Sequence, residues 1–219
     1  AMLPPFFARA GRTPALLAAL TPSLAALVLL WGHGAAVFSG ESVEAVAPWV
    51  PSLGLEWALR IDGLGFFFAS LILVIGVLIF IYSRGYLAGN EPLGTFYAYL
   101  LLFQGAMLGV VLADNLLLLP VFWELTSLSS FLLIGFWRHL QDGRRGARLA
   151  LAITGAGGLA LLAGLILLGE VAGTYRLSEL AARRELILAS PLAPAILTLI
   201  LLGAFTKSAQ FPFHFWLPH

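Results

Sequence analysis

The sequence predicts an all-α fold, a polytopic transmembrane helix bundle with about six spans. Of the 219 residues, 60% are hydrophobic and only 11% are charged, whereas soluble domains average about 45–50% apolar and about a quarter charged residues. The mean hydropathy is +0.96. Six apolar runs are long enough, at roughly 20 residues each, to cross a bilayer as helices. None of them alternates with the period of two that is typical of a β-barrel strand.

The six predicted spans are separated by polar connections. They cover residues 15–38, 64–82, 95–113, 115–137, 147–171 and 192–217. The connection 39–61 is expected to be an acidic loop, and 138–146 a basic one. Asp114 and Asn115 are expected to form a tight turn between the third and fourth spans. A short surface helix is expected from Ser178 onward. We interpret residues 1–219 as a single transmembrane domain.

Charge and cysteine content exclude several classes of protein. The 12 Lys and Arg and 11 Asp and Glu residues are too few to cover the surface of a soluble enzyme of this length. A net charge of +1 leaves no basic excess for binding nucleic acid. Because the chain has no cysteine, it cannot form a disulfide, a zinc–thiolate site or an all-cysteine iron–sulfur site. No metal and no cofactor are therefore expected on this chain.

The distribution of basic residues predicts the orientation. With the amino terminus inside, more arginines lie on the inner side than on the outer side, as the positive-inside rule requires. The inner ones are Arg9, Arg12, Arg84, Arg138, Arg144, Arg145 and Arg148; the outer ones are Arg60, Arg176, Arg183 and Arg184. We therefore expect a cytoplasmic amino terminus.

Two ionisable side chains remain inside the predicted spans, Glu124 and Lys207. Helix rise places Glu124 roughly 13 Å and roughly 20 Å from the ends of its span, and Lys207 roughly 15 Å from either interface. A charge at that depth costs at least ~2.5–3.5 kcal/mol on insertion scales, so such residues are usually paired, line a cavity or have a function. The functional interpretation is a proton or cation relay, in which the proton affinity of each group responds to the other.

Three other arrangements of these two residues remain open. Glu124 and Lys207 could form a static ion pair that holds two helices together. The carboxyl group could instead be satisfied by Ser127, three residues on and on the same helix face. A short or tilted last span could also expose Lys207.

Proline follows the lysine closely. Pro212 removes one helical hydrogen bond and clashes with the carbonyl of Ser208, so the backbone beside Lys207 is expected to be kinked or opened. Interrupted helices at mid-membrane are typical of transporters, although an ordinary proline kink is the alternative. Pro120, four residues before Glu124, is expected to repeat the pattern.

Two weaker features lie near these residues. His214 is a candidate for a further step on a proton path, the alternative being an interface residue among aromatic side chains. The run Gly-Ala-Gly-Gly at 155–158 lies inside an apolar span with no strand before it. It therefore predicts close helix packing rather than a nucleotide site.

Two sequence blocks resemble a known family. One covers 113–137 and includes Trp-Glu-Leu-Thr-Ser at 123–127; the other covers 202–218 and includes Phe-Thr-Lys-Ser-Ala-Gln-Phe-Pro-Phe-His-Phe-Trp at 205–216. Both are similar to the antiporter-like proton-translocating subunits shared by respiratory complex I and the multisubunit Mrp-type cation/proton antiporters. The amino-acid sequences of these two blocks, together with that of residues 51–65, are most similar to the large A subunit of the antiporter.

This resemblance implies roles and partners. The residues matching the family's proton-translocation pair are Glu124 and Lys207, and the family's lysine helix is interrupted. The family has a helix before the first predicted span and continues beyond residue 218, so we expect an amino-terminal fragment carrying part of one antiporter-like repeat. The implied setting is the bacterial cytoplasmic (inner) membrane, the implied partners are other membrane subunits of a hetero-oligomeric antiporter complex, and the implied ligands are protons and monovalent cations.

The expected function is therefore that of a transporter subunit, not an enzyme, which exchanges protons for a monovalent cation, with sodium as the first candidate. The alternative is a proton-pumping membrane-arm subunit of NADH:quinone oxidoreductase (complex I) or of a membrane-bound hydrogenase. In that case the redox chemistry would lie on other subunits. A purely structural membrane scaffold is the third interpretation.

Overall fold

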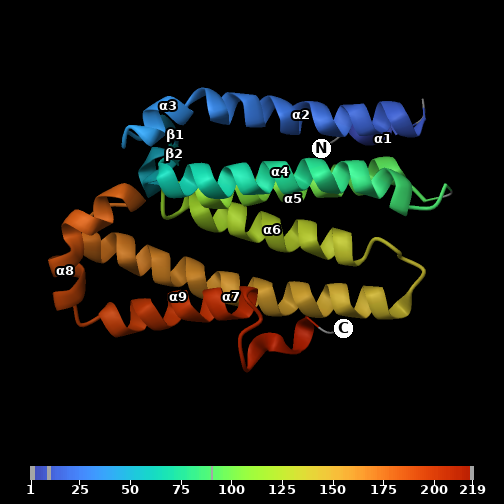
Figure 1. Cartoon of the computed structure of the whole chain (residues 1–219). Coiled ribbons are helices and arrows are strands. Elements are labelled where there is room, and N and C mark those ends of the chain that lie inside the picture. Colours follow the sequence, from blue (N-terminus) through green and yellow to red (C-terminus); the bar gives the residue numbers. More distant parts are fainter. Residues whose placement is uncertain (1–2, 9–10, 90, 218–219) are drawn as a thin grey trace. The chain divides into compact units, whose positions relative to one another are not determined.

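The computed structural model describes residues 3–8, 11–89 and 91–217. Two residues of the sequence-based predictions lie outside them: Arg9 of the charge asymmetry and Pro218 of a family block. The chain divides into two compact units, Ala1–Glu44 with Arg60–Leu112 and Ala45–Leu59 with Ala113–His219. Figure 1 shows their helices along the sequence. That 1–219 forms one transmembrane domain remains a prediction.

The first unit is helical throughout most of its described residues. Its helices are α1 (Leu3–Phe7), α2 (Arg12–Gly32), α3 (Gly34–Phe38), α4 (Gly63–Tyr86) and α5 (Leu93–Leu112). The long helices α2, α4 and α5 all pack against one another. Helix α4 begins where Asp62 accepts a hydrogen bond from the Gly65 N–H at 2.8 Å, an N-cap that satisfies one otherwise unpaired donor. The first predicted span is shorter than expected, because α2 ends at Gly32 and the chain restarts as α3.

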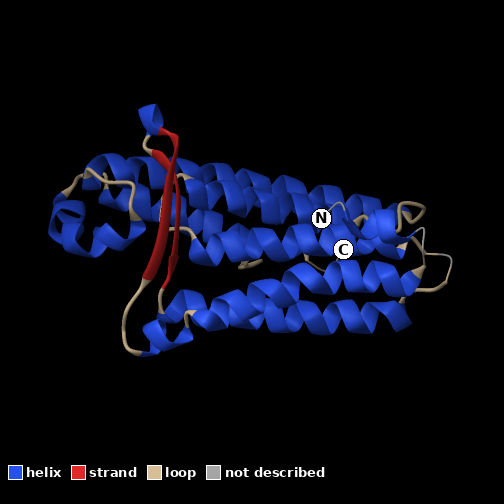
Figure 2. Ribbon diagram, turned by 90° about the horizontal axis from the view of Figure 1, so that it is seen from above, coloured by secondary structure: helices blue, strands red, loops and turns tan. Residues whose placement is uncertain are grey.

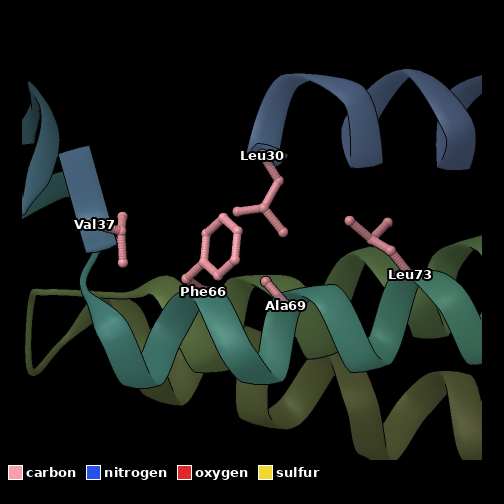
Figure 3. Packing of buried hydrophobic residues seen from close by; sticks show 5 residues of the cluster. All are labelled: Leu30, Val37, Phe66, Ala69 and Leu73. Carbon is pink, nitrogen blue, oxygen red and sulfur yellow. The ribbon is translucent and has the colours of Figure 1, made fainter. Parts of the chain in front are cut away.

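Apolar side chains of α2, α3 and α4 form the core of this unit. Figure 3 shows Leu30 and Val37 facing Phe66, Ala69 and Leu73 of α4. All five are at most 8% exposed. Because two of these helices are long enough to cross a membrane, this packing joins spans rather than covering a water-exposed surface.

Two polar side chains inside the first unit, Ser23 and Gln104, are paired with each other. Ser23 donates to the Gln104 side-chain oxygen at 2.7 Å, and Gln104 donates to the Ile72 carbonyl at 3.3 Å. At the carboxyl end of α4, the guanidinium of Arg12 donates to the carbonyls of Arg84, Leu87 and Ala88. Because the last carbonyls of a helix have no partner within that helix, Arg12 caps the carboxyl end of α4.

A β-hairpin occupies the segment that was expected to be an acidic loop. Strands β1 (Val43–Val50) and β2 (Leu55–Ile61) are joined by the short 3₁₀ turn η2 (Pro51–Leu53) and by Gly54, which has φ 68°. Figure 2 shows the two strands side by side. The rings of Trp49 and Trp57 meet edge to face across the hairpin at 5.9 Å. The all-α prediction therefore lacks these strands. Strand β1 is mostly exposed, whereas β2 does alternate, with Leu55, Trp57, Leu59 and Ile61 at every second position.

The rest of the second unit consists of helices and short 3₁₀ turns, of which α7 is the longest. They are α6 (Leu118–Ile134), α7 (Gln141–Ala172), η3 (Leu177–Arg183), α8 (Arg184–Ala189), α9 (Ala193–Lys207) and η4 (Phe213–Trp216). Helix α7 packs against both α6 and α9. Most of the predicted basic connection belongs to the first turns of α7. The expected surface helix is a 3₁₀ turn, η3, followed by the single short helix α8.

The prediction of a polytopic membrane bundle is confirmed, with an approximate number of spans. In the described part of the chain, α2, α4, α5 and α7 are long and apolar enough to cross a membrane, while α6 and α9 are shorter apolar helices of 17 and 15 residues. The prediction that Pro120 interrupts its helix is wrong. Because α6 begins at Leu118, Pro120 lies in its first turn, where a missing N–H breaks no helical hydrogen bond.

Candidate functional site

Glu124 lies on the face of α6 that packs against α7. Its Oε1 atom is buried and has no hydrogen-bond partner among the described residues. A Cβ atom built at Gly158 of α7 would overlap this oxygen, and one built at Gly155 would lie 3.9 Å from Oε2. The two glycines are three residues apart and therefore share a helix face. The carboxyl group thus occupies space that α7 leaves open by having no side chain there.

Lys207, the last residue of α9, contacts α6. Its Nζ donates to the hydroxyl of Thr126 at 2.6 Å and to that of Ser127 at 2.8 Å. The amine also lies 5.6 Å from the centre of the Trp123 ring, within the range of a cation–π contact. Since Thr126 and Ser127 follow Glu124 by two and three residues, the lysine contacts α6 within one turn of the carboxyl group.

The two charged groups interact electrostatically without direct contact. Each contributes a Coulombic interaction to the other. Among the described residues, however, no ion pair of 4.0 Å or less joins Glu124 to Lys207. The static ion pair is therefore not formed in this conformation. The alternative in which Ser127 satisfies Glu124 is wrong in this conformation, because the Ser127 hydroxyl donates to the Trp123 carbonyl at 3.4 Å and accepts from Lys207.

The chain leaves the helical path directly after the lysine, as the proline pattern predicts. Helix α9 ends at Lys207, and Ala209 adopts φ 50°. The N–H of Gln210 bonds back to the Phe205 carbonyl at 2.9 Å, and the indole N–H of Trp216 donates to the Thr206 carbonyl at 3.0 Å. These bonds satisfy helix-end carbonyls that would otherwise have no partner.

His214 lies in η4, beyond this break. Its side chain is exposed and its ring stacks on Phe211 with centroids 5.7 Å apart. Within the described residues it makes no side-chain hydrogen bond to Glu124 or Lys207. Its place on a proton path therefore stays a prediction.

Small residues bring the three helices together around the pair. A Cβ at Gly157 would overlap the hydroxyl of Thr206, and one at Gly203 would lie 2.9 Å from the Gly157 carbonyl oxygen. The prediction of close packing at 155–158 is confirmed. What the sequence did not reveal is that Gly158 accommodates Glu124 and that Thr126 holds Lys207. The only local signal for Thr126 was its position two residues after the glutamate.

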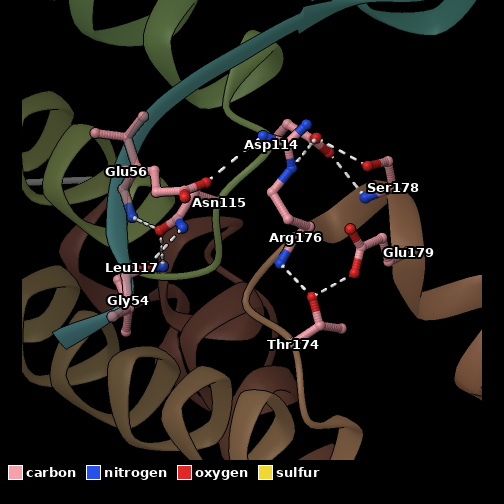
Figure 4. Close-up of polar contacts among 10 residues, drawn as sticks. Gly54, Glu56, Asp114, Asn115, Leu117, Thr174, Arg176, Ser178 and Glu179 are labelled. Atoms are coloured by element: carbon pink, nitrogen blue, oxygen red, sulfur yellow. Dashed lines mark hydrogen bonds and ion pairs between the residues drawn. The ribbon is translucent and has the colours of Figure 1, made fainter. Parts of the chain in front are cut away.

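The amino-terminal end of α6 is anchored by a buried carboxylate. Asp114 is 3% exposed and lies 3.1 Å from the guanidinium of Arg176. It also accepts hydrogen bonds of 2.8 Å from both the backbone N–H and the hydroxyl of Ser178. Figure 4 shows these contacts, together with Glu56 of β2 at 3.6 Å from Arg176.

Asn115 completes the predicted tight turn. Its side-chain oxygen accepts from the N–H groups of Leu117 and Leu118 at 2.9 and 3.1 Å, while its amide donates to the Gly54 carbonyl at 3.0 Å. The first turn of α6 is therefore fixed to the turn of the hairpin (Figure 4). Asn115 also pairs with Arg176 as an isolated antiparallel bridge.

Tyr175 lies beside this turn, after the end of α7. Burial raises the pKa of its hydroxyl, and so does the hydrogen bond of 2.8 Å that it donates to Glu170.

Across residues 3–8, 11–89 and 91–217, no group of three or more His, Cys, Asp and Glu side chains could hold a metal ion.

Comparison with known sequences gives matches along most of the chain. Residues 113–219 match the family model described as NADH:quinone oxidoreductase/Mrp antiporter, TM, and residues 49–97 match the one described as NADH-Ubiquinone oxidoreductase (complex I), chain 5 N-terminus. The probable A/B subunit of a K(+)/H(+) antiporter of Rhizobium meliloti is 54% identical over 84% of the chain and 18% of its own length. The A1 subunit of a Na(+)/H(+) antiporter of Staphylococcus haemolyticus is 53% identical over 82% of the chain and 22% of its own length. The chain therefore spans about a fifth of the length of these relatives.

Two solved structures share the fold. A chain of the Mrp complex from Dietzia sp. superposes with a TM-score of 0.82 at 36% identity, over 99% of this chain and 23% of that one. A chain of the membrane-bound sulfane sulfur reductase, an archaeal respiratory membrane complex, superposes with a TM-score of 0.77 over 94% of this chain and 31% of that one. At 20% identity, the second match shows the fold alone.

Proposed function

This chain belongs to the family of antiporter-like membrane subunits that respiratory complex I shares with Mrp-type antiporters, and we propose that it provides part of the proton pathway of a secondary transporter. The transporter exchanges protons for a monovalent cation, for which we propose sodium because the staphylococcal relatives are named for it. The chain is a multi-pass membrane protein. We place it in the bacterial cytoplasmic membrane with its amino terminus inside, among other membrane subunits of a hetero-oligomeric complex.

The observation that carries the proposal is the unequal pairing of the two membrane charges. Lys207 is held by two hydroxyl groups, whereas the buried Oε1 of Glu124 has no donor among the described residues. A carboxyl group without a fixed donor is able to take up and release a proton or a cation. Because the two groups interact electrostatically, a change of charge on Glu124 alters the free energy of the charged form of Lys207.

The test is substitution of each member of the pair in the complete assembly. Glu124→Gln keeps the shape of the side chain but cannot carry a proton or a charge, and Lys207→Ala removes the amine. Each is expected to abolish or strongly impair cation-dependent proton flux, measured in vesicles and normalised to assembled complex. Glu185→Gln, on the exposed helix α8, is the matched control and should transport normally.

The double variant separates transport from structure. If the pair only held helices together, each single variant would leave one buried charge unpaired, destabilise the protein by about 3–5 kcal/mol and so lower the amount of folded complex. The double variant would then restore folding and flux together. Under the relay, the double variant restores at most the folding, because nothing titratable remains at that depth. Normal normalised flux in Glu124→Gln or in the double variant would contradict the proposal.

The alternative of a redox-driven complex has weaker support. The match to the sulfane sulfur reductase complex is 20% identical, against 36% for the Mrp complex. Neighbouring genes for antiporter subunits would support exchange, whereas genes for hydrogenase or NADH-oxidising subunits would support the alternative.

A further inference from the structure

A pocket of about 590 Å³ opens where α6 ends and α7 begins, away from the Glu124–Lys207 site. Its lining combines apolar and strongly basic side chains. The lining residues are Phe131, Leu132, Gly135, Arg138, Arg144, Ala147 and Arg148. The acidic residue of this segment, Asp142 in the first turn of α7, does not line the pocket. The pocket therefore presents cationic groups beside an apolar wall.

The length of α7 places these arginines at the membrane surface. A helix of 32 residues is about 48 Å long, which exceeds the ~30 Å hydrocarbon core of a bilayer. The excess extends the ends of α7 into the headgroup layers. Arg144 and Arg148 are the fourth and eighth residues of the helix, so they lie on one face and within its first three turns. Both side chains are exposed.

The apolar wall continues from this level toward the membrane interior. Phe131 and Leu132 belong to the last turn of α6, and Ala147, fully buried, belongs to the second turn of α7. A ligand that fits must carry a negative charge at one end and hydrocarbon next to it. Guanidinium groups bind phosphate oxygens through paired N–H donors, which is the chemistry of a phosphodiester headgroup.

We propose that this pocket binds an anionic phospholipid. Its phosphate would contact Arg144 and Arg148, and the parts of its acyl chains nearest the headgroup would contact Phe131 and Leu132. Basic pockets between membrane helices are known to select such headgroups, and the volume lies within the roughly 300–1,000 Å³ of ordinary ligand sites. A bound lipid would join the ends of α6 and α7, the two helices between which Glu124 is packed. The proposal concerns lipid binding and does not depend on which ion the complex transports.

The test measures lipid binding by the full-length protein in its purified complex, stripped of lipid in detergent and titrated with phosphatidylglycerol. Native mass spectrometry reports the lipid bound. Arg144→Gln with Arg148→Gln should weaken phosphatidylglycerol binding by about 30-fold, the effect of two arginines at headgroup level. The control, Arg145→Gln with Arg184→Gln, removes the same charge without touching the pocket lining and should bind as the parent does.

Three further measurements decide between occupants. Leu132→Trp fills the apolar part while keeping the arginines, so the proposal requires it to lose phosphatidylglycerol as well; this holds even if the double arginine variant fails to assemble. Equal binding by the double variant and its control would overturn the proposal. So would displacement of the lipid by millimolar inorganic phosphate, which would indicate a free-anion site. A photo-crosslinker at Phe131 that captures protein instead of lipid would overturn it too.

Discussion

The space for the Glu124 carboxyl group depends on one hydrogen atom, the side chain of Gly158. A methyl group there would overlap Oε1, while the same methyl group at Gly155 would only reach ordinary contact distance, 3.9 Å from Oε2. Glycine in the middle of a helix is otherwise unfavourable by roughly 0.5–1 kcal/mol relative to alanine. Its presence at 158 is therefore explained by the neighbouring helix and not by α7 itself.

We expect Gly158→Ala to impair transport in the complete complex by displacing Glu124, and Gly155→Ala to leave transport close to normal. The measurement is cation-dependent proton flux normalised to assembled complex, with thermal unfolding recorded in parallel. Because both variants add the same methyl group to the same helix, a difference between them reports the contact with Glu124. Equal flux in the two variants would show that the carboxyl group tolerates displacement.

At the level of elements, the entry into α6 is held by partners from the hairpin and from the segment after α7. Asp114 and Arg176 are the charged pair of this junction, and Asn115 caps the first turn of α6 (Figure 4). Only 3% of Asp114 is exposed, and its carboxylate is paired with Arg176 and accepts two hydrogen bonds from Ser178. The position of Glu124, within the second turn of α6, rests on this junction.

Arg176→Gln should destabilise the protein by about 3–5 kcal/mol, because it leaves the buried Asp114 carboxylate without its cation. Thermal unfolding of the detergent-solubilised complex measures the loss, and Arg183→Gln, on the exposed turn η3, is the control. Adding Asp114→Asn to Arg176→Gln should recover part of the lost stability. A double variant less stable than Arg176→Gln alone would show that Ser178, rather than the ion pair, is the main partner of Asp114.

At the level of the whole molecule, the arginine asymmetry predicts that 138–148 faces the cytoplasm and that 41–56 faces outward. Since the chain has no cysteine, single cysteines at Gln141 and Ser42, both exposed, can be labelled in intact cells. An impermeant thiol reagent added outside should label Ser42→Cys and spare Gln141→Cys until the membrane is permeabilised. The reverse pattern would invert the topology.

Features that depend on local composition were predictable. Apolar runs define membrane helices because every backbone group must find its partner inside the bilayer, and the sequence alone shows where those runs lie. Glu124 and Lys207 stood out because charges are rare at that depth, and the end of α9 followed from Pro212. The prediction at Pro120 failed for a local reason too: the effect of a proline depends on where the helix begins, and sequence patterns place helix ends only to within a few residues.

Features that depend on contacts between distant segments required the tertiary structure. The amine of Lys207 meets Thr126 across 81 positions of sequence, and no periodicity within either span indicates that hydroxyl groups, not the carboxylate, receive it. The hairpin pairs two strands and the basic pocket forms where α6 meets α7, so both depend on contacts between segments. Only the alternation of β2 indicates the hairpin within one segment. The sequence by itself determined that this is a membrane protein and predicted two ionisable residues, Glu124 and Lys207, inside its spans. Only the packing of α6, α7 and α9 decided which atoms those charges face.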